Sequence, residues 1–182
     1  MGLAYLKYLY LAHFSKPVGD RALYQAIRRL PARRILEIGI GSADRTMRLV
    51  KLARRSAGRE PVRYVAIDLF EGRGPDLPRG LSLKETHRLL AATDVPTQLI
   101  PGEAAQVLAR AANSLANMDL VLISAQHDVM SLAGGWFYVP RMLHPGSQVF
   151  LETRAAEGGT SLRLMPATEI EVLASSARRR AA

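Results

Sequence analysis

The sequence predicts an α/β fold, a three-layer sandwich in which helices cover both faces of a mostly parallel sheet. Five short apolar runs rich in β-branched residues alternate with longer segments of helical character, which is typical of parallel strands joined by crossover helices. At 182 residues the chain is long enough for one such domain with a substantial core. The expected strands are 34–39, 63–67, 97–100, 118–124 and 148–152, and the expected crossover helices are 43–57, 82–91 and 103–114.

Prolines separate the N-terminal part of the chain from this sheet. Residues 1–31 are expected to form a helical region, with Pro17 and Pro31 interrupting it. Residues 32–177 are then expected to form the α/β sheet domain. The last five residues, 178–182, are expected to be a disordered basic tail.

The sheet is expected to finish in a shortened antiparallel end. Only residues 153–160 separate the fifth strand from the next strand-like run, 162–165, and they include two adjacent glycines. That length suits a hairpin turn and leaves no room for a packed helix. The sixth strand is therefore expected to pair directly with the fifth, and 169–173 to form a final strand or helix.

The first strand leads into a glycine-rich turn that opens a helix. In the segment 34–43 an acid, Glu37, comes two residues before Gly39, and Gly41 follows. Because glycines carry no Cβ, a ligand can approach the backbone and its free N–H groups closely. A dinucleotide-binding fingerprint would have its third glycine at position 44, where this chain has Asp44.

The pattern Glu37-x-Gly39-x-Gly41-x-Ala43 resembles the first motif of the class I S-adenosylmethionine-dependent methyltransferases. In that family the glycine turn packs against the amino-acid end of the cofactor. The resemblance therefore implies that the chain binds S-adenosylmethionine, with Glu37, Gly39, Gly41 and Ser42 near that end. The cofactor has an ammonium and a sulfonium but no phosphate, so a carboxylate near the turn suits it better than a lysine. The alternative is a purely structural turn.

A second acid, Asp68, ends the second strand. In Rossmann-type sheets such an acid accepts hydrogen bonds from the ribose hydroxyls, and the resemblance gives that role to Asp68 with Leu69 beside it. The separation of 27 residues from Gly41 exceeds the usual figure of about 20, and the loop 56–61 accounts for the excess. The alternative is that Asp68 only caps the strand or begins a turn.

The segment after the third strand carries Glu103 and Ala104. In the family this segment, often Gly-acid-Ala, lies along the adenine ring, so the resemblance places Glu103 at the adenine edge. Glu103 also stands where a helix begins, and the helix dipole alone favours an acid there.

The fourth strand ends at Ser124, which the resemblance makes a further candidate cofactor-binding residue, and continues into His127 and Asp128. Many family members have an Asp at the position of Ser124, and in the metal-dependent O-methyltransferases that Asp helps to hold a divalent cation. Ser124 and Gln126 are poor ligands for a hard cation, so we expect no metal site. His127 and Asp128 follow the strand at the carboxyl edge of the sheet and are the candidate catalytic residues, because an imidazole can accept a proton near neutral pH. The alternative is a loop histidine without a catalytic role.

Composition excludes several classes of protein. The absence of cysteine rules out disulfides, thiolate metal sites and cysteine nucleophiles, and it fits a cytoplasmic location. No stretch approaches the roughly 20 apolar residues of a membrane span. The apolar N-terminal run is interrupted by Lys7 and is expected to be an amphipathic helix.

Positive charge is concentrated in the first third of the chain. Residues 1–63 contain 14 Lys or Arg and 4 Asp or Glu, while the whole chain has a formal net charge of +9. This concentration of positive charge is compatible with an RNA partner, whose phosphates the basic side chains would neutralise. The alternative is that Arg48 and Arg55 simply form the solvated face of a helix. The aromatic N-terminal helix, with Tyr5, Tyr8 and Tyr10, either covers an acceptor pocket or packs in the core or in a homodimer.

The sequence therefore predicts an S-adenosylmethionine-dependent methyltransferase that acts without a metal on a small molecule. Two alternatives stay open. One is an S-adenosylmethionine-binding protein that lacks transferase activity, suggested by Ser124 and the shortened C-terminal half. The other is a basic RNA-binding module.

Overall fold

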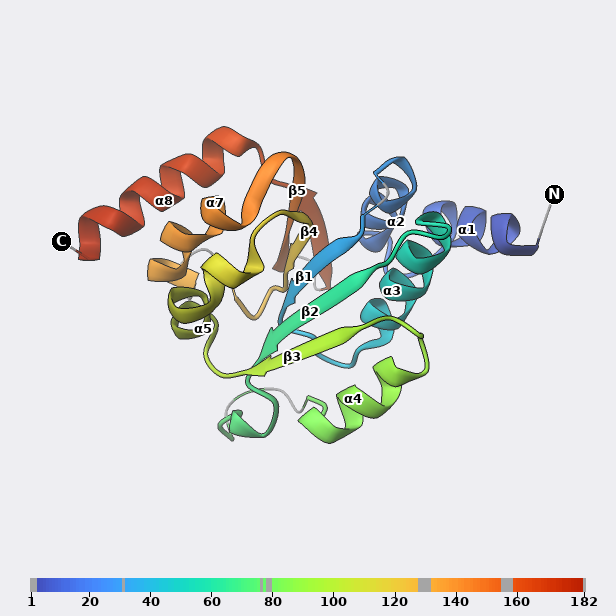
Figure 1. The fold of residues 1–182 in the computed structure, drawn as a ribbon, viewed down its shortest axis with the longest axis horizontal. Helices are drawn as coiled ribbons and strands as arrows, with labels where there is room; N and C mark the ends of the chain where they lie inside the picture. The colour runs from blue at the N-terminus through green and yellow to red at the C-terminus, as the bar shows by residue number, and fades with distance from the viewer. Residues whose placement is uncertain are drawn as a thin grey trace.

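The fold is a three-layer α/β sandwich around a six-stranded sheet (Figure 1). The computed structural model describes residues 3–30, 32–75, 77, 80–127, 132–154 and 159–181. The strand order is β3-β2-β1-β4-β5-β6, and every neighbouring pair is parallel except β5 and β6. The strands are β1 (Arg34–Ile38), β2 (Arg63–Asp68), β3 (Thr97–Pro101), β4 (Met118–Ile123), β5 (Leu143–Arg154) and β6 (Thr160–Leu164).

Alternating side chains of the strands bury against helices on both sides. On one face, Ile35, Tyr64 and Leu122 belong to a core that includes residues of three helices. On the other face, Leu36, Ile67 and other residues pack against the C-terminal helices. The first face is covered by α1 (Leu3–His13), α2 (Asp20–Arg29), α3 (Asp44–Ser56) and α4 (Leu83–Ala91), and the second by α5 (Ala104–Ala111), α7 (Val139–Met142) and α8 (Ala167–Ala181). Short 3₁₀ turns are η1 (Phe70–Gly72), η2 (Ala112–Leu115) and η3 (Ala133–Tyr138).

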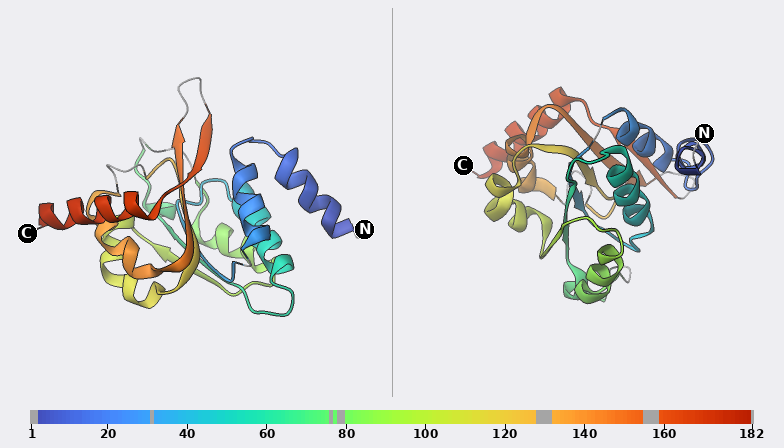
Figure 2. Two further views of the ribbon diagram at one scale, coloured as in Figure 1. Left: turned by 90° about the horizontal axis from the view of Figure 1, so that it is seen from above. Right: turned by 45° about the vertical axis from the view of Figure 1, so that its right-hand side comes forward.

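The layered prediction and the antiparallel end are confirmed. β6 pairs directly with β5, with Phe150 opposite Leu164 and Arg154 opposite Thr160. β5 is longer than the expected 148–152 at both ends, because it begins at Leu143, which pairs with Met118 of β4, and ends at Arg154 in this hairpin. The hairpin projects from the body of the molecule in the left panel of Figure 2. The hairpin lies against the start of α2, since a Cβ on Gly19 would come within 3.1 Å of the Ser161 backbone.

The predicted disordered tail is wrong for the residues that the structure describes, because α8 continues to Ala181. Ile170 and Ala177, earlier in this helix, are buried in the second core, while Arg178 and Arg179 are exposed. The tail thus continues a helix that packing stabilises over its preceding turns. The two chain ends lie at opposite sides of the molecule (Figures 1 and 2).

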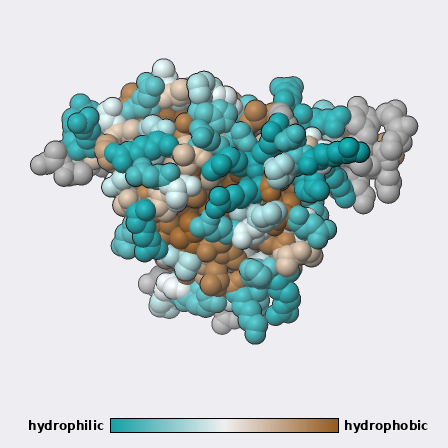
Figure 3. All heavy atoms as spheres, viewed as in Figure 1, coloured by the Kyte–Doolittle hydropathy of each residue, from teal (hydrophilic) through white to brown (hydrophobic). Residues whose placement is uncertain are grey.

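The edge strand β3 is only partly covered, with Leu99 and Ile100 at intermediate exposure. Figure 3 accordingly shows apolar surface in the middle of the face, between hydrophilic helices on either side. No helix in the described part of the chain is long and apolar enough to cross a bilayer.

Candidate functional site

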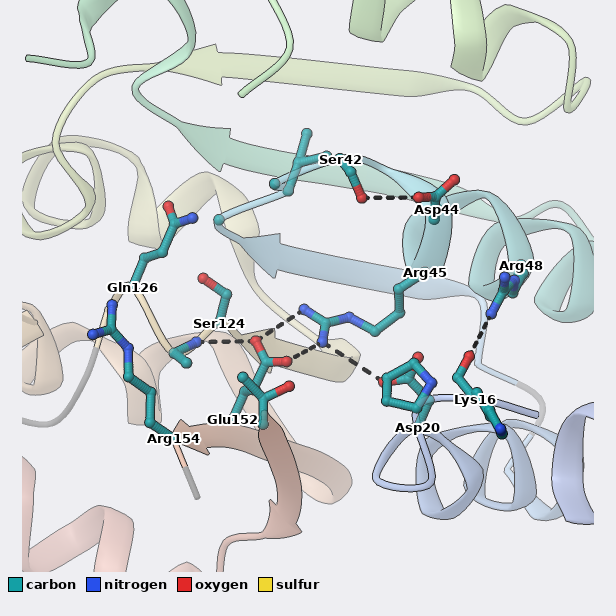
Figure 4. Close-up of a pocket in the computed structure, with 16 residues that line it drawn as sticks. Lys16, Asp20, Ser42, Asp44, Arg45, Arg48, Ser124, Gln126, Glu152 and Arg154 are labelled. Atoms are coloured by element: carbon teal, nitrogen blue, oxygen red, sulfur yellow. Dashed lines mark hydrogen bonds and ion pairs between the residues drawn. The ribbon is translucent and has the colours of Figure 1, made fainter. Parts of the chain in front are cut away.

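A cavity of about 500 Å³ opens at the carboxyl ends of β1, β4 and β5 (Figure 4). The strand order reverses between β1 and β4, since β2 and β3 lie on one side of β1 while β5 and β6 lie beyond β4. In open α/β sheets, ligands bind in the crevice at such a reversal. The volume is in the range of small-molecule sites. The lining residues come from the N-terminal segment, the glycine turn, the end of β4 and the β5–β6 hairpin: Lys16, Pro17, Asp20, Gly39, Ile40, Gly41, Ser42, Asp44, Arg45, Arg48, Ser124, Ala125, Gln126, Glu152, Arg154 and Thr160.

Gly39 and Gly41 have different structural roles in the turn. Gly39 has φ of +86°, and a Cβ there would overlap the side chain of Ser124 and lie 3.1 Å from the His127 ring. Gly41 has φ of +64°, and a Cβ there would meet nothing within 4 Å. Gly39 therefore lets β1 and β4 approach each other, whereas Gly41 leaves open space above the backbone. Ala43 also has positive φ, at 62°, directly before α3.

Ser124 lies on the floor of the cavity with an unused hydroxyl. Its side chain is 6% exposed, and Oγ has no hydrogen-bond partner in the described structure. The backbone around it is fully engaged, because Ser124 N donates to Ile38 O at 2.9 Å and His127 N donates to Ser124 O at 2.8 Å. A buried polar atom without a partner costs free energy, so this hydroxyl is available to a ligand.

The wall of the cavity is an ion cluster centred on Arg45 of α3. Its guanidinium donates to both oxygens of Glu152 on β5, at 2.6 Å to Oε1 and 3.3 Å to Oε2. Asp20 Oδ1 lies 3.7 Å from Arg45 Nη1, and Glu37 Oε1 lies 3.8 Å from Arg45 Nε. Glu152 Oε2 also accepts from the backbone N–H of Ala125 at 3.0 Å. One guanidinium thus joins α2, β1 and β5 to α3.

The pKa values of the three acids are shifted in different directions: those of Glu37 and Asp20 are raised, and that of Glu152 is lowered. Desolvation raises the pKa of Glu37 and of Asp20, and Arg45 offsets this only in part. Desolvation also acts on Glu152, but the hydrogen bond and charge of Arg45, together with the Ala125 N–H and the Thr160 side chain, outweigh it and hold the pKa of Glu152 below its usual value. The strongest ion pair of the cluster is therefore Arg45–Glu152.

Glu37 holds β1 to α3 and β2 beside the glycine turn, and it does not line the cavity. Its side chain is fully buried on the α3 face of the sheet, where Oε2 accepts from Thr46 Oγ1 at 2.8 Å and from Tyr64 OH at 2.6 Å. Burial, followed by the neighbouring Glu37 carboxylate, raises the pKa of Tyr64 well above its usual value, so Tyr64 acts as a hydrogen-bond donor.

Asp68 holds the turn from the neighbouring strand. Its Oδ2 accepts from the backbone N–H of Ile40 at 2.7 Å, while Oδ1 accepts from Phe70 N at 3.1 Å and from Arg73 Nη2 at 2.6 Å. The Asp68 and Arg73 side chains are 3% and 7% exposed. A carboxylate offers about four acceptor positions, so these contacts leave one for a ligand. Leu69, at intermediate exposure, begins the turn η1.

Glu103 acts as the N-cap of α5. Its carboxylate accepts from Ala105 N at 3.1 Å and Gln106 N at 3.0 Å, and Ala104 is 1% exposed. Both side-chain oxygens thus satisfy the helix N-terminus, and Glu103 lies outside the cavity lining described above.

The structure therefore brings only part of the predicted set together. Gly39, Gly41, Ser42 and Ser124 share the cavity, and the His127 ring lies beside Gly39. Glu37, Asp68, Leu69, Glu103 and Ala104 lie outside its lining, while Asp128 falls outside the described residues.

Sequence reasoning missed Asp20, Glu152 and Arg45, the last of which counted only among the 14 basic residues of the first third of the chain. Arg45 is instead largely buried, with 16% of its side chain exposed. The sequence did contain a signal for Glu152, because it is a charged residue at the end of an apolar strand. Among the residues that the structure describes, no group of three or more His, Cys, Asp or Glu side chains could hold a metal ion.

Comparison with known proteins identifies the fold. No protein-family model matches the chain, and no curated protein sequence matches it. The O-methyltransferase TomG from Streptomyces achromogenes, solved with S-adenosylmethionine, superposes with a TM-score of 0.54 at 20% identity over 84% of this chain. An O-methyltransferase from Bacillus cereus, solved with S-adenosylhomocysteine, gives 0.53 at 16% identity, again over 84% of this chain. A TehB-like methyltransferase from Corynebacterium glutamicum gives 0.52 at 15% identity, over 96% of this chain and 79% of its own.

This chain covers 66% of the length of the first two structures. At these identities the likeness shows the fold alone, and it confirms the predicted Rossmann-like α/β sandwich.

Proposed function

We propose that this chain is an S-adenosylmethionine-dependent methyltransferase that acts on a small-molecule acceptor without a bound metal ion. The observation that carries the proposal is the cavity at the β1/β4 reversal, which the glycine turn and the end of β4 line together. The similar folds support it, because two of those structures contain S-adenosylmethionine or S-adenosylhomocysteine.

The residues present fit the amino-acid end of S-adenosylmethionine. The space above Gly41 is open, and the hydroxyl of Ser124 is buried without a partner on the same cavity. Backbone N–H groups of the turn, Ser42 Oγ and Ser124 Oγ would hold that end. Asp68 would offer its remaining acceptor position to a ribose hydroxyl, so its contact with Arg73 can persist. When bound, S-adenosylmethionine supplies a methyl group activated by its sulfonium.

The chain's own residues would orient the acceptor and receive its proton. Methyl transfer depends on in-line geometry, which a rigid cavity wall supplies. Arg45 and Glu152 provide that rigidity by joining α3 to β5. His127, next to Gly39 and Ser124, would accept the proton that the acceptor loses. Metal independence is proposed from the donor groups at the end of β4, since a serine hydroxyl and an amide at 124 and 126 are weak ligands for a hard cation.

Calorimetry with S-adenosylmethionine, S-adenosylhomocysteine and NAD tests the cofactor. We expect binding of the first two and none of NAD. Binding of none of the three would contradict the proposal. Release of S-adenosylhomocysteine in the presence of acceptors and EDTA then separates a metal-independent transferase from a protein that only binds the cofactor.

The role of His127 has its own test. His127→Gln should lower kcat at least a hundredfold, within the usual contribution of a proton acceptor, and leave the affinity for S-adenosylhomocysteine unchanged. An unchanged kcat would remove His127 from the mechanism. The RNA-binding alternative predicts a gel shift at low salt that disappears as salt rises, and no shift at low salt would exclude it.

A further inference from the structure

Three cations stand on opposite walls of the cavity. Lys16 and Arg48 lie on the side of the N-terminal segment and α3, and Arg154 lies across from them beside Gln126 at the end of β5 (Figure 4). All three are exposed residues. Arg48 Nη1 donates to the backbone oxygen of Lys16 at 3.1 Å, so these two are held next to each other.

Two of the three carboxylates in the cavity lining are paired with Arg45. Glu152 and Asp20 face its guanidinium at 2.6 and 3.7 Å, and the charge of Arg48 also lowers the pKa of Asp20 from farther away. Asp44 accepts from Ser42 Oγ at 3.0 Å and occupies the first turn of α3, where the helix dipole favours a negative charge. In the described part of the chain, by contrast, no carboxylate lies within ion-pair distance of Lys16, Arg48 or Arg154.

The floor of the cavity leaves these cations to a second ligand. Ser124 Oγ, which is more than nine-tenths buried and has no partner in the described structure, is assigned above to the cofactor. An acceptor that enters between the walls would lie beside the bound cofactor with positive charge on both sides. Charge-assisted hydrogen bonds from arginine to planar anions are among the strong polar contacts in proteins.

We infer that the acceptor is a small anion, with a carboxylate or phosphate group held between Arg154 on one wall and Lys16 and Arg48 on the other. The inference rests on the proposed methyltransferase function and adds the substrate class to it. An anionic acceptor is also favoured beside a sulfonium, because opposite charges attract strongly in a partly desolvated cavity.

The test compares anions with neutral molecules of the same shape. Calorimetry would measure 4-hydroxybenzoate against 4-hydroxybenzamide, lactate against lactamide, and phenyl phosphate against its neutral diamide, phenyl phosphorodiamidate. Each titration is made with the full chain, alone and saturated with S-adenosylhomocysteine. We expect at least one anion to bind about tenfold more tightly than its neutral twin. The carboxylate and phosphate arms distinguish the two kinds of anion.

Arg154→Gln is the test variant and Arg59→Gln its matched control. Both remove one exposed arginine, but Arg59 lies outside the cavity lining. Arg154→Gln should abolish most of the preference for the anion, and Arg59→Gln should preserve it. An equal preference in both variants, or no preference for any anion, would overturn the inference.

The cofactor's own carboxylate is the competing explanation for these cations. If S-adenosylhomocysteine displaces the anion, the cations hold the cofactor and the inference fails. If both bind together, the anion occupies the acceptor site. Failure of S-adenosylhomocysteine to bind at all would refute the proposed function, and it would be seen separately from the preference for anions.

Discussion

The guanidinium of Arg45 donates to Glu152 Oε1 at 2.6 Å, although the two residues are 107 positions apart in the chain. The pair closes the cavity wall between α3 and β5, and Asp20 and Glu37 approach the same guanidinium. Removing Arg45 would leave the buried carboxylates of Asp20, Glu37 and Glu152 without the positive charge that neutralises them.

Arg45→Met should therefore lower the free energy of unfolding by about 3–5 kcal/mol, the usual cost of breaking a buried ion pair from one side. Urea unfolding at pH 7 measures it. Arg59→Gln, which removes an exposed arginine that has no ion pair among the described residues, should change the value by less than about 0.5 kcal/mol. If the two variants were equally stable, the ion cluster would not contribute to stability.

Glu37 should make the protein more stable as the pH falls from neutrality. Burial raises the pKa of Glu37 above its ordinary value, so the folded state binds a proton that the unfolded state releases. Stability then increases as the pH drops through the folded pKa towards the unfolded one at 4.5. Unfolding free energies of wild type and Glu37→Gln, measured from pH 7.5 to 5, should diverge in favour of wild type at the acid end. A constant difference across that range would contradict the raised pKa.

Gly58 provides a matched control for a substitution at Gly41 in the glycine turn. Both have positive φ, at 64° and 62°, and a Cβ on either would meet nothing within 4 Å. Alanine at each position should cost about 1 kcal/mol of stability, because the left-handed conformation disfavours a Cβ. Only Gly41→Ala also places a methyl group in the cavity, so we expect it alone to weaken S-adenosylhomocysteine binding, about tenfold or more. Equal affinities in the two variants would show that the ligand does not approach Gly41.

Ser124→Ala should be neutral or stabilising by up to about 1 kcal/mol, since it removes a buried hydroxyl that has no partner. Ser15 provides the comparison, because it is equally buried and its Oγ donates to Leu11 O at 2.6 Å. Ser15→Ala should cost about 1 kcal/mol. Thermal unfolding measures both, and titration with S-adenosylhomocysteine should show a loss of affinity for Ser124→Ala only. A clear destabilisation by Ser124→Ala would mean that the hydroxyl has a structural partner.

Asp68→Ala should weaken cofactor binding about 10- to 100-fold. The change removes the acceptor for Ile40 N in the glycine turn and leaves Arg73 without its partner. Asp119→Ala is a suitable control, because its carboxylate also accepts backbone N–H groups, those of Arg33 and Arg34 at 2.8 Å, but where β1 begins, at the opposite edge of the sheet. Calorimetry with S-adenosylhomocysteine checks both affinities. An unchanged affinity in Asp68→Ala would show that the ribose assignment is wrong.

The local sequence pattern was enough to predict the strands, the helices and the glycine turn. The strand 34–39, the glycine turn and the helix from about 43 depend on neighbouring residues, and the structure has them as β1 and α3 within one residue of those bounds. The β5–β6 pairing was also predictable, since eight residues with two glycines cannot hold a packed helix. The predicted tail failed because the packing of Ile170 and Ala177 is not visible in the composition of the last residues.

The assignment of roles to the acids depended on tertiary structure. Sequence spacing gave Glu37 and Asp68 similar positions at strand ends, yet Glu37 bonds Thr46 and Tyr64 inside the core while Asp68 bonds Ile40 and Arg73. Both support the turn, and neither lines the cavity.

The sequence by itself determined the alternation of strands and helices and a bare backbone bend after the first strand, because hydrophobic periodicity and glycine conformation act over a few residues. Only the tertiary structure decided that Arg45 would be buried among Asp20, Glu37 and Glu152, and that Lys16 and Arg154 would face each other across one cavity. Those contacts join segments far apart in the chain, and they form only when the sheet order brings the ends of β1, β4 and β5 together.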